Sequence, residues 1–330
     1  MELIAETAWH HEGDYDFMRN LVESICYKSS ADIVKLHITL DLDEYMHRDH
    51  DAYKSLKKWL FSEKEWEYLI NVIKDSGKKL LLLLNDTKAI EYAFQFQPDF
   101  VELHSVCMNV PRLQKALIDK KDYDFKVFLG VGGSSVLEVE KSIEELSSRE
   151  IVLMFGFQNY PTRYEDINLL KINKIQKMFS ELSYGYADHT SWNEPNNELI
   201  TLLVSSNDMN YIEKHVTTVH GEKRCDSSAA ISIDMFNKLH EKLVILDQIK
   251  GNGELDLNDG EKAYSVFGPM KMAPIAKKNI SKGELLTNSH IDFYRTKEVS
   301  EMSQIDIIRM IGNAVSENIS KGQIFKWSHF

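Results

Sequence analysis

The chain has 330 residues, of which 43% are hydrophobic, and this is enough to bury the core of one large domain and a smaller one. The formal net charge of −12, with lysines and arginines dispersed along the chain, argues against a nucleic-acid surface or an anionic membrane surface as partner. The three cysteines are odd in number and lack a C-x-x-C pair. We therefore expect reduced thiols and a cytoplasmic protein that binds small molecules.

The sequence carries no recognisable export or anchoring signal. Residues 1–5 lead straight into a strand-like segment without a basic stretch, and the apolar run Leu80–Leu84 is too short to span a bilayer. We expect no membrane association.

Short apolar segments alternate with helix-like stretches along the first 250 residues. Ser62–Glu65 and Ser135–Glu138 are capping-box patterns that each open a helical period, and apolar residues from Ile233 to Leu246 recur at spacings of three and four. The expected strands are Leu3–Trp9, Ile33–Leu40, Lys79–Leu84, Asp99–Ser105, Val127–Gly132, Ile151–Phe157, Ser183–Asp188 and Tyr211–Val216. Eight strands alternating with helices predict an α/β fold of the (β/α)₈ TIM-barrel type, whereas a doubly wound sheet usually has fewer strands.

A change in composition after Ile249 predicts a second domain. Glycines and acidic residues break the helical period, which predicts a linker at 251–270 between a barrel at 1–250 and a tail at 271–330. Within the tail, the segment Asn279–Leu286 recurs as Asn318–Phe325. Two copies of a strand-turn-strand unit predict a small β-rich module.

Four polar residues are expected at one end of the barrel. Alternate residues of a barrel strand point inward, so Glu6, Lys35, His189 and His215 can face one cavity at the carboxyl ends of the strands. Each residue alone is more often a buried histidine or a surface carboxylate. Their shared position favours a site in which the two histidines bind one metal ion.

The sequence also resembles the sialic acid synthase (N-acetylneuraminate synthase) family over nearly its whole length. In the order of that family's motifs, the similar segments are Ile4–Asp14, Ala31–Lys35, Tyr160–Thr162, Gly185–Thr190 and Glu213–His215. The segment Lys282–Leu286 is similar to the family's antifreeze-protein-like SAF domain.

The resemblance implies an activity and a cofactor. Members of the family condense phosphoenolpyruvate with an N-acylated amino sugar, using a divalent metal, to give a sialic-type nonulosonic acid and phosphate. The metal, Mn²⁺ or Mg²⁺, would bind His189 and His215, and Glu6 and Lys35 would be catalytic, with Lys35 holding the carboxylate or phosphate of the donor. A domain-swapped homodimer is also implied, in which Arg295 caps the partner's sugar pocket. The substrate-binding residues that it implies or allows are Ser105, Gly132, Gln158, Tyr160, Arg163, Glu213, Asp226 and Arg295.

Departures from the family pattern concentrate on the expected phosphate site. Glu102 stands where the family has a lysine, and Gly130 and Ala187 stand where it has serines. We expect Glu102 either to point away from the cavity or to be neutralised by a cation such as Arg163. Otherwise the chain is a relative of the same fold that acts on a different anionic substrate, or a non-catalytic sugar-binding protein.

Overall fold

The protein is described here by a computed structural model that covers residues 1–156, 159 and 162–330. The chain divides into two units, Met1–Gly251 and Asn252–Phe330. The predicted Gln158 and Tyr160 lie outside the described residues. A search of the described helices finds none with the length and hydropathy needed to cross a bilayer.

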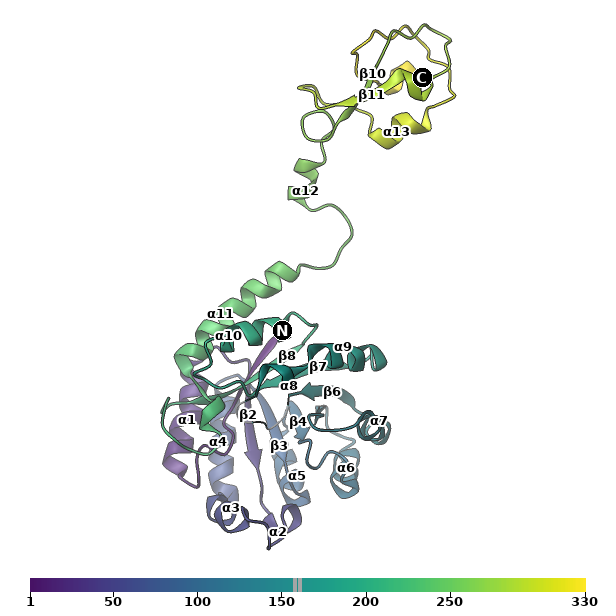
Figure 1. Ribbon diagram of the computed structural model, residues 1–330. Coiled ribbons are helices and arrows are strands. Elements are labelled where there is room, and N and C mark those ends of the chain that lie inside the picture. The colour runs from purple at the N-terminus through teal and green to yellow at the C-terminus, as the bar shows by residue number, and fades with distance from the viewer. Residues whose placement is uncertain (157–158, 160–161) are drawn as a thin grey trace. The chain divides into compact units, whose positions relative to one another are not determined.

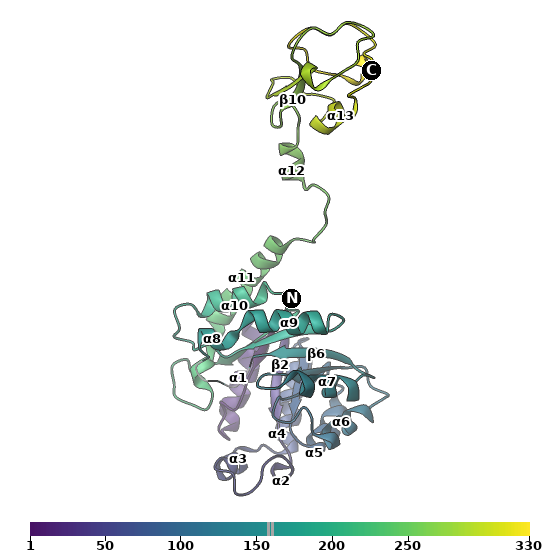
Figure 2. The same cartoon turned by 45° about the vertical axis from the view of Figure 1, so that its right-hand side comes forward.

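The first unit contains a closed parallel barrel, which confirms the predicted (β/α)₈ fold. Strands β1 to β8 pair in sequence order, and β8 pairs with β1 to close the ring. Helices lie outside the strands in both views (Figure 1, Figure 2). The strands are β1 Glu2–Glu6, β2 Ile33–Ile38, β3 Lys79–Leu84, β4 Phe100–Leu103, β5 Lys126–Gly130, β6 Glu150–Phe155, β7 Ser183–Asp188 and β8 Tyr211–Thr217.

Helices follow each strand, and several begin at a side-chain cap. Ser62 and Ser135 form the capping boxes that the sequence predicts, at the starts of α4 and α7. The helices of this unit are α1 Tyr15–Lys28, α2 Leu42–Tyr45, α3 Tyr53–Trp59, α4 Glu63–Asp75, α5 Thr87–Ala93, α6 Pro111–Ile118, α7 Val136–Glu145, α8 Tyr164–Ile167, α9 Leu169–Met178, α10 Asn197–Ser205 and α11 Ile233–Lys250. A short strand, β9 Ile231–Ser232, extends the pairing beyond β8.

Two apolar layers hold the barrel together. The larger layer packs the outward faces of the strands against the helices. A smaller cluster fills the barrel interior with buried side chains that include Ile4, Phe100, Phe128 and Tyr211. This interior plug occupies the amino-terminal side of the strands, so the next inward positions toward the carboxyl ends are left to form a cavity.

Several strands end earlier at the carboxyl edge than the sequence predicts, whereas β3 and β7 end at the predicted residues and β8 ends one residue later. β1 stops at Glu6 rather than Trp9, because Ala8 has a φ of 46° that an extended strand cannot contain. β6 stops at Phe155, before Gly156 with a φ of 91°. These turns begin the loops that rim the cavity.

The second unit has its own core, with Leu286, Ile307 and Phe325 among its buried residues. Its helices are α12 Asp259–Tyr264, which lies in the expected linker, and α13 Gln304–Arg309, and its strands are β10 Ala273–Ala276 and β11 Ile291–Tyr294. The two copies of the internal repeat pair with each other: the backbone N–H groups of Ile280 and Ile319 each donate to the other's carbonyl at 2.9 Å.

Candidate active site

The residues that line the barrel cavity follow from the period of the strands. Glu6 lies two positions beyond Ile4, and Glu213 lies two beyond Tyr211, so both point into the barrel above the apolar plug. The strand register places the Cα of Glu6 opposite Lys35 on β2 and opposite His215 on β8. The cavity at this end is lined by Glu6, Lys35, His189, Glu213 and His215, with others.

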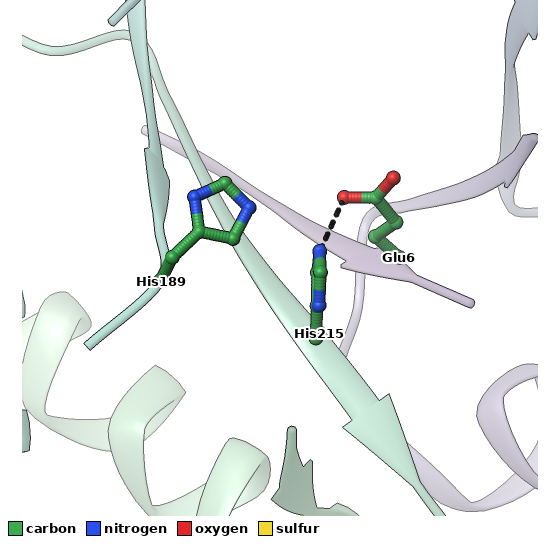
Figure 3. Close-up of side chains that lie close together, drawn as sticks. All are labelled: Glu6, His189 and His215. Carbon is green, nitrogen blue, oxygen red and sulfur yellow. Dashed lines mark ion pairs between the residues drawn. The ribbon is translucent and has the colours of Figure 1, made fainter. Parts of the chain in front are cut away.

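Three side chains of this cavity form a group that can hold a metal ion. One ligand atom each from Glu6, His189 and His215 lies within 4.8 Å of the other two. His215 Nε2 is 3.1 Å from Glu6 Oε2, and the ring centroids of His189 and His215 are 4.8 Å apart. Figure 3 shows the three groups directed into one space, from β1, from β8 and from just beyond β7.

The electrostatics of this group suit a divalent ion. Burial lowers the pKa of His189 to about 3, so its imidazole is neutral at pH 7, which is the form that binds metals. Burial opposes ionisation of Glu6, but Lys35 and His215 outweigh it and hold the pKa of Glu6 well below its usual value. Two imidazoles and one carboxylate form a donor set that leaves positions open for water and substrate.

Lys35 lies at the centre of three buried carboxylates. Its Nζ is 2.8 Å from Glu102 Oε2, 2.9 Å from Glu213 Oε2 and 3.5 Å from Glu6 Oε1. Burial alone would lower the pKa of Lys35, but the three carboxylates outweigh burial and raise it. Burial raises the pKa of Glu102 and, together with the charge of Glu6, raises that of Glu213 well above its usual value.

Of the two expectations that would keep Glu102 from opposing a phosphate, the first is wrong, and the second holds with a cation other than Arg163. Glu102 does not point away from the cavity: its side chain is buried and contacts Lys35. Arg163 does not neutralise it, because the Arg163 side chain is 69% exposed and pairs with Glu165 and Asp166. The cation beside Glu102 is Lys35.

The other predicted binding residues are distributed between several places. Ser105 and Asp226 line the same cavity as Lys35. Gly132 lies instead in a neighbouring cavity lined by residues of α7 and α9. Arg295 belongs to the second unit, where its guanidinium donates to the carbonyl of Pro269 at 2.9 Å.

Several histidines of the cavity wall were not singled out from the sequence. His37 and His104 line the cavity, and their rings lie nearly parallel with centroids 6.5 Å apart. Burial lowers the pKa of His37 to about 3 and that of His104 to about 4, so both are neutral at pH 7. The signal was available, because His37 lies two residues after Lys35 on the same face of β2.

His10 packs against His215, one of the residues that line the cavity. Its ring lies edge-on to His215 with centroids 5.6 Å apart, and its Nδ1–H donates to the carbonyl of Cys225 at 2.6 Å. Cys225, Cys26 and Cys107 are all free thiols, as expected.

Fold and site together define a (β/α)₈-barrel protein with a buried histidine–carboxylate centre at the carboxyl ends of its strands. The sequence pattern of the NeuB family matches residues 25–255, and the chain belongs to this family.

Relatives extend along nearly the whole chain. An uncharacterized protein of Methanocaldococcus jannaschii is 25% identical and aligns over 98% of this chain and 93% of its own length. The N,N'-diacetyllegionaminic acid synthase of Legionella pneumophila is 23% identical, over 99% of this chain and 94% of that protein. Among solved structures, a Chromobacterium violaceum protein described as spore coat polysaccharide biosynthesis protein E superposes with a TM-score of 0.82 at 16% identity, over 100% of this chain and 99% of that one. This structural likeness supports the fold.

Proposed function

We propose that this protein is a metal-dependent synthase that joins the enol carbon of a three-carbon donor to the aldehyde carbon of an open-chain N-acylated amino sugar, giving a nonulosonic acid. The observation that carries the proposal is the group formed by Glu6, His189 and His215 at the active end of a NeuB-family barrel. The name of the Legionella relative, a synthase of a legionaminic acid, supports the product class.

A divalent ion, Mn²⁺ or Mg²⁺, would be held by His189 and His215, with Glu6 within reach of the same ion. When bound, it would supply a Lewis acid that polarises a substrate carbonyl and orients it. The neutral state of His189 and the low pKa of Glu6 support this assignment, because both groups are ready to donate an electron pair at pH 7.

The protein's own groups would move protons and exclude water. Glu6, as a carboxylate 3.1 Å from His215 Nε2, is placed to exchange a proton with a substrate hydroxyl or with an attacking water. Lys35 holds Glu6, Glu102 and Glu213 together, so its positive charge is shared among carboxylates rather than offered to a ligand. The cavity walls are buried, which strengthens these electrostatic interactions.

The remaining assignments follow from the family resemblance. We assign residues 271–330 to an SAF domain, the assembly to a domain-swapped homodimer and the location to the cytoplasm. The pairing of the two tail repeats through Ile280 and Ile319 is the observation that supports a single small module.

Mass spectrometry of the products tests the function. Full-length protein with Mn²⁺, N-acyl hexosamines and a panel of three-carbon donors should form a nine-carbon acid, and removal of metal by EDTA should stop product formation. His189→Gln should abolish both turnover and Mn²⁺ binding measured by electron paramagnetic resonance, whereas His240→Gln, on α11, should leave both intact. Sugar binding with no product from any donor would instead support a non-catalytic sugar-binding protein.

A further inference from the structure

A second cavity lies beside the active site, in the apolar layer between the strands and the outer helices. It is the neighbouring cavity that Gly132 lines, and it has a volume of about 300 Å³. Phe155 and Gly156, at the end of β6, line both this cavity and the active one. Helices α7, α8 and α9 supply much of the remaining wall. The buried residues of the wall are Val131, Val139, Phe155, Ile172, Ile175 and Tyr186.

The buried part of this wall is apolar except at Tyr186. Among the buried residues just named, Tyr186 is the one whose side chain carries a polar group. A buried water usually makes about two to four hydrogen bonds, and these side chains offer one. An apolar cavity of about 150 Å³ is large enough to hold benzene. This cavity therefore has room for a small ring compound, and its buried side chains favour such a compound over water.

Tyr186 brings a hydroxyl group to this cavity without a partner of its own. Ala187 lines the active cavity, so the neighbouring Tyr186 points outward from β7. Tyr186 is 3% exposed, and burial raises the pKa of its hydroxyl, which therefore stays protonated at pH 7. Within the part of the chain that the structure describes, this hydroxyl has no hydrogen-bond partner. Because an unpaired buried hydroxyl is unfavourable, a ligand that pairs with it gains affinity.

Tyr184, two residues earlier on the same face of β7, shows the usual arrangement. Its hydroxyl lies 2.6 Å from the carbonyl oxygen of Phe179 and 2.9 Å from that of Gln176. Both tyrosines are buried on one strand, but Tyr186 lines the cavity and Tyr184 does not. The cavity is therefore what separates the Tyr186 hydroxyl from a partner in the protein.

We propose that this cavity is a second ligand site, for a small ring compound that carries one hydroxyl or N–H group and pairs it with the Tyr186 hydroxyl. Such a ligand enters from solvent past Glu165 and Lys171, which line the cavity and are exposed. Its binding involves none of the three residues of the metal group, so the site goes beyond the proposed synthase function. Once bound, the ligand lies against Phe155 and Gly156, which also wall the active cavity.

Binding of p-cresol to the full-length protein, with ¹³C-labelled methyl groups of isoleucine, valine and leucine, tests the site. NMR titration should shift the methyl signals of Val139, Ile172 and Ile175 saturably, with a Kd on the order of 1 mM or below. The methyl signals of Leu199 and Leu203, which line an exposed apolar groove elsewhere on the barrel, should not shift. Absence of saturation at millimolar p-cresol, or shifts confined to Leu199 and Leu203, would overturn the proposal.

The hydroxyl pair is tested with p-xylene, in which a methyl group replaces the hydroxyl of p-cresol. Tyr186→Phe should weaken p-cresol binding about threefold or more and leave p-xylene binding within about twofold. Tyr184→Phe is the matched control and should change neither affinity. Because only Tyr184 loses hydrogen bonds within the protein, its variant should unfold at a lower urea concentration, whereas Tyr186→Phe should keep the midpoint of the unchanged protein.

A third variant tests the space itself. Val139→Phe places a larger side chain in the cavity and should abolish binding of both compounds. Equal loss of p-cresol and p-xylene affinity in Tyr186→Phe would contradict the hydrogen bond, and full binding by a folded Val139→Phe protein would contradict the location. If neither variant folds, the methyl shifts of the unchanged protein decide the question. Synthase activity is measured separately, so failure of this site leaves that proposal standing.

Discussion

Asp188 and Lys214 form a fully buried ion pair directly behind the two histidines of the active site. Lys214 Nζ is 2.9 Å from Asp188 Oδ2, and neither side chain is exposed to solvent. Asp188 immediately precedes His189, and Lys214 immediately precedes His215. Because neighbouring strand residues point to opposite faces, the pair fixes the ends of β7 and β8 on the outer side of the barrel.

Helix α10 completes the network around this pair. Thr201 Oγ1 donates to Asp188 Oδ2 at 2.6 Å, and Lys214 Nζ donates to Asn197 Oδ1 at 3.0 Å. The pair therefore links two strands and a helix, and the separation of His189 from His215 depends on all three.

Lys214→Met is expected to destabilise the protein strongly, because it leaves the Asp188 carboxylate buried without its cation. The expected loss is about 3–5 kcal/mol of unfolding free energy in urea. In the fraction that stays folded, Mn²⁺ affinity should fall about 10- to 100-fold, because the histidines lose their fixed positions.

Lys242→Met is the matched control for this change. Lys242 pairs with Glu198 on the surface, with both side chains more than 40% exposed, so the loss should stay below about 1 kcal/mol. Equal losses for the two variants would contradict the special role of the buried pair.

The inward face of the strands could be predicted from the sequence. The period of two identified Glu6 and Lys35 as neighbours in space, and the register of β1 with β2 confirms that they lie opposite each other. The same rule applied to β4 would have joined Glu102 to His104, two residues further on.

The enclosure of Lys35 could not be predicted. It requires side chains from β1, β4 and β8 to converge on an atom of β2 across the barrel. Such distances depend on barrel radius and side-chain rotamers, and sequence spacing contains neither. The left-handed backbone at Ala8, which ends β1 early, was likewise invisible, because alanine is not a residue that favours that conformation.

His11 should make stability depend on pH in the acid range. Its ring is buried against Phe61, with centroids 4.4 Å apart, and its Nδ1 accepts from the N–H of Gly13. Burial lowers its pKa from 6.5 to about 3. The unfolded chain therefore binds the proton first, so the contribution to stability is complete above pH 6.5 and is lost as the pH falls from 6.5 toward 3.

His11→Phe is expected to remove this part of the pH dependence. Between pH 7 and pH 5, the drop in unfolding free energy should be smaller than in the unchanged protein by about 2 kcal/mol, measured by urea denaturation at each pH. His50→Phe replaces a histidine that is exposed in the fold and should leave the drop unchanged. A similar drop in the His11→Phe protein would show that burial of this ring does not set the acid sensitivity.

A dimer is expected from the family resemblance, with Arg295 serving the sugar pocket of the other subunit. Sedimentation equilibrium at micromolar concentration should give about twice the mass of one chain.

Arg295 donates to the carbonyl of Pro269 within its own unit. Arg295→Ala should raise the KM for the sugar about tenfold or more, because one charge-assisted hydrogen bond to the sugar is lost. The mass of the assembly should not change. Arg309→Ala, on α13, is the control and should leave this KM unchanged. A sedimentation mass equal to that of one chain would contradict the dimer.

Ala8→Gly is expected to stabilise the protein, although it removes a buried methyl group. Ala8 is 3% exposed and has a φ of 46° at the turn that follows β1. The left-handed conformation costs a residue with a Cβ about 1–2 kcal/mol, and glycine avoids this cost while losing about 0.5–1 kcal/mol through the greater freedom of its unfolded chain. The net expectation is a gain of about 0.5–1 kcal/mol in urea unfolding.

Ala116→Gly, inside α6, is the control and should instead lose about 1 kcal/mol. A loss at both positions would mean that the packing of the Ala8 methyl group against the cavity wall outweighs the strain of its backbone.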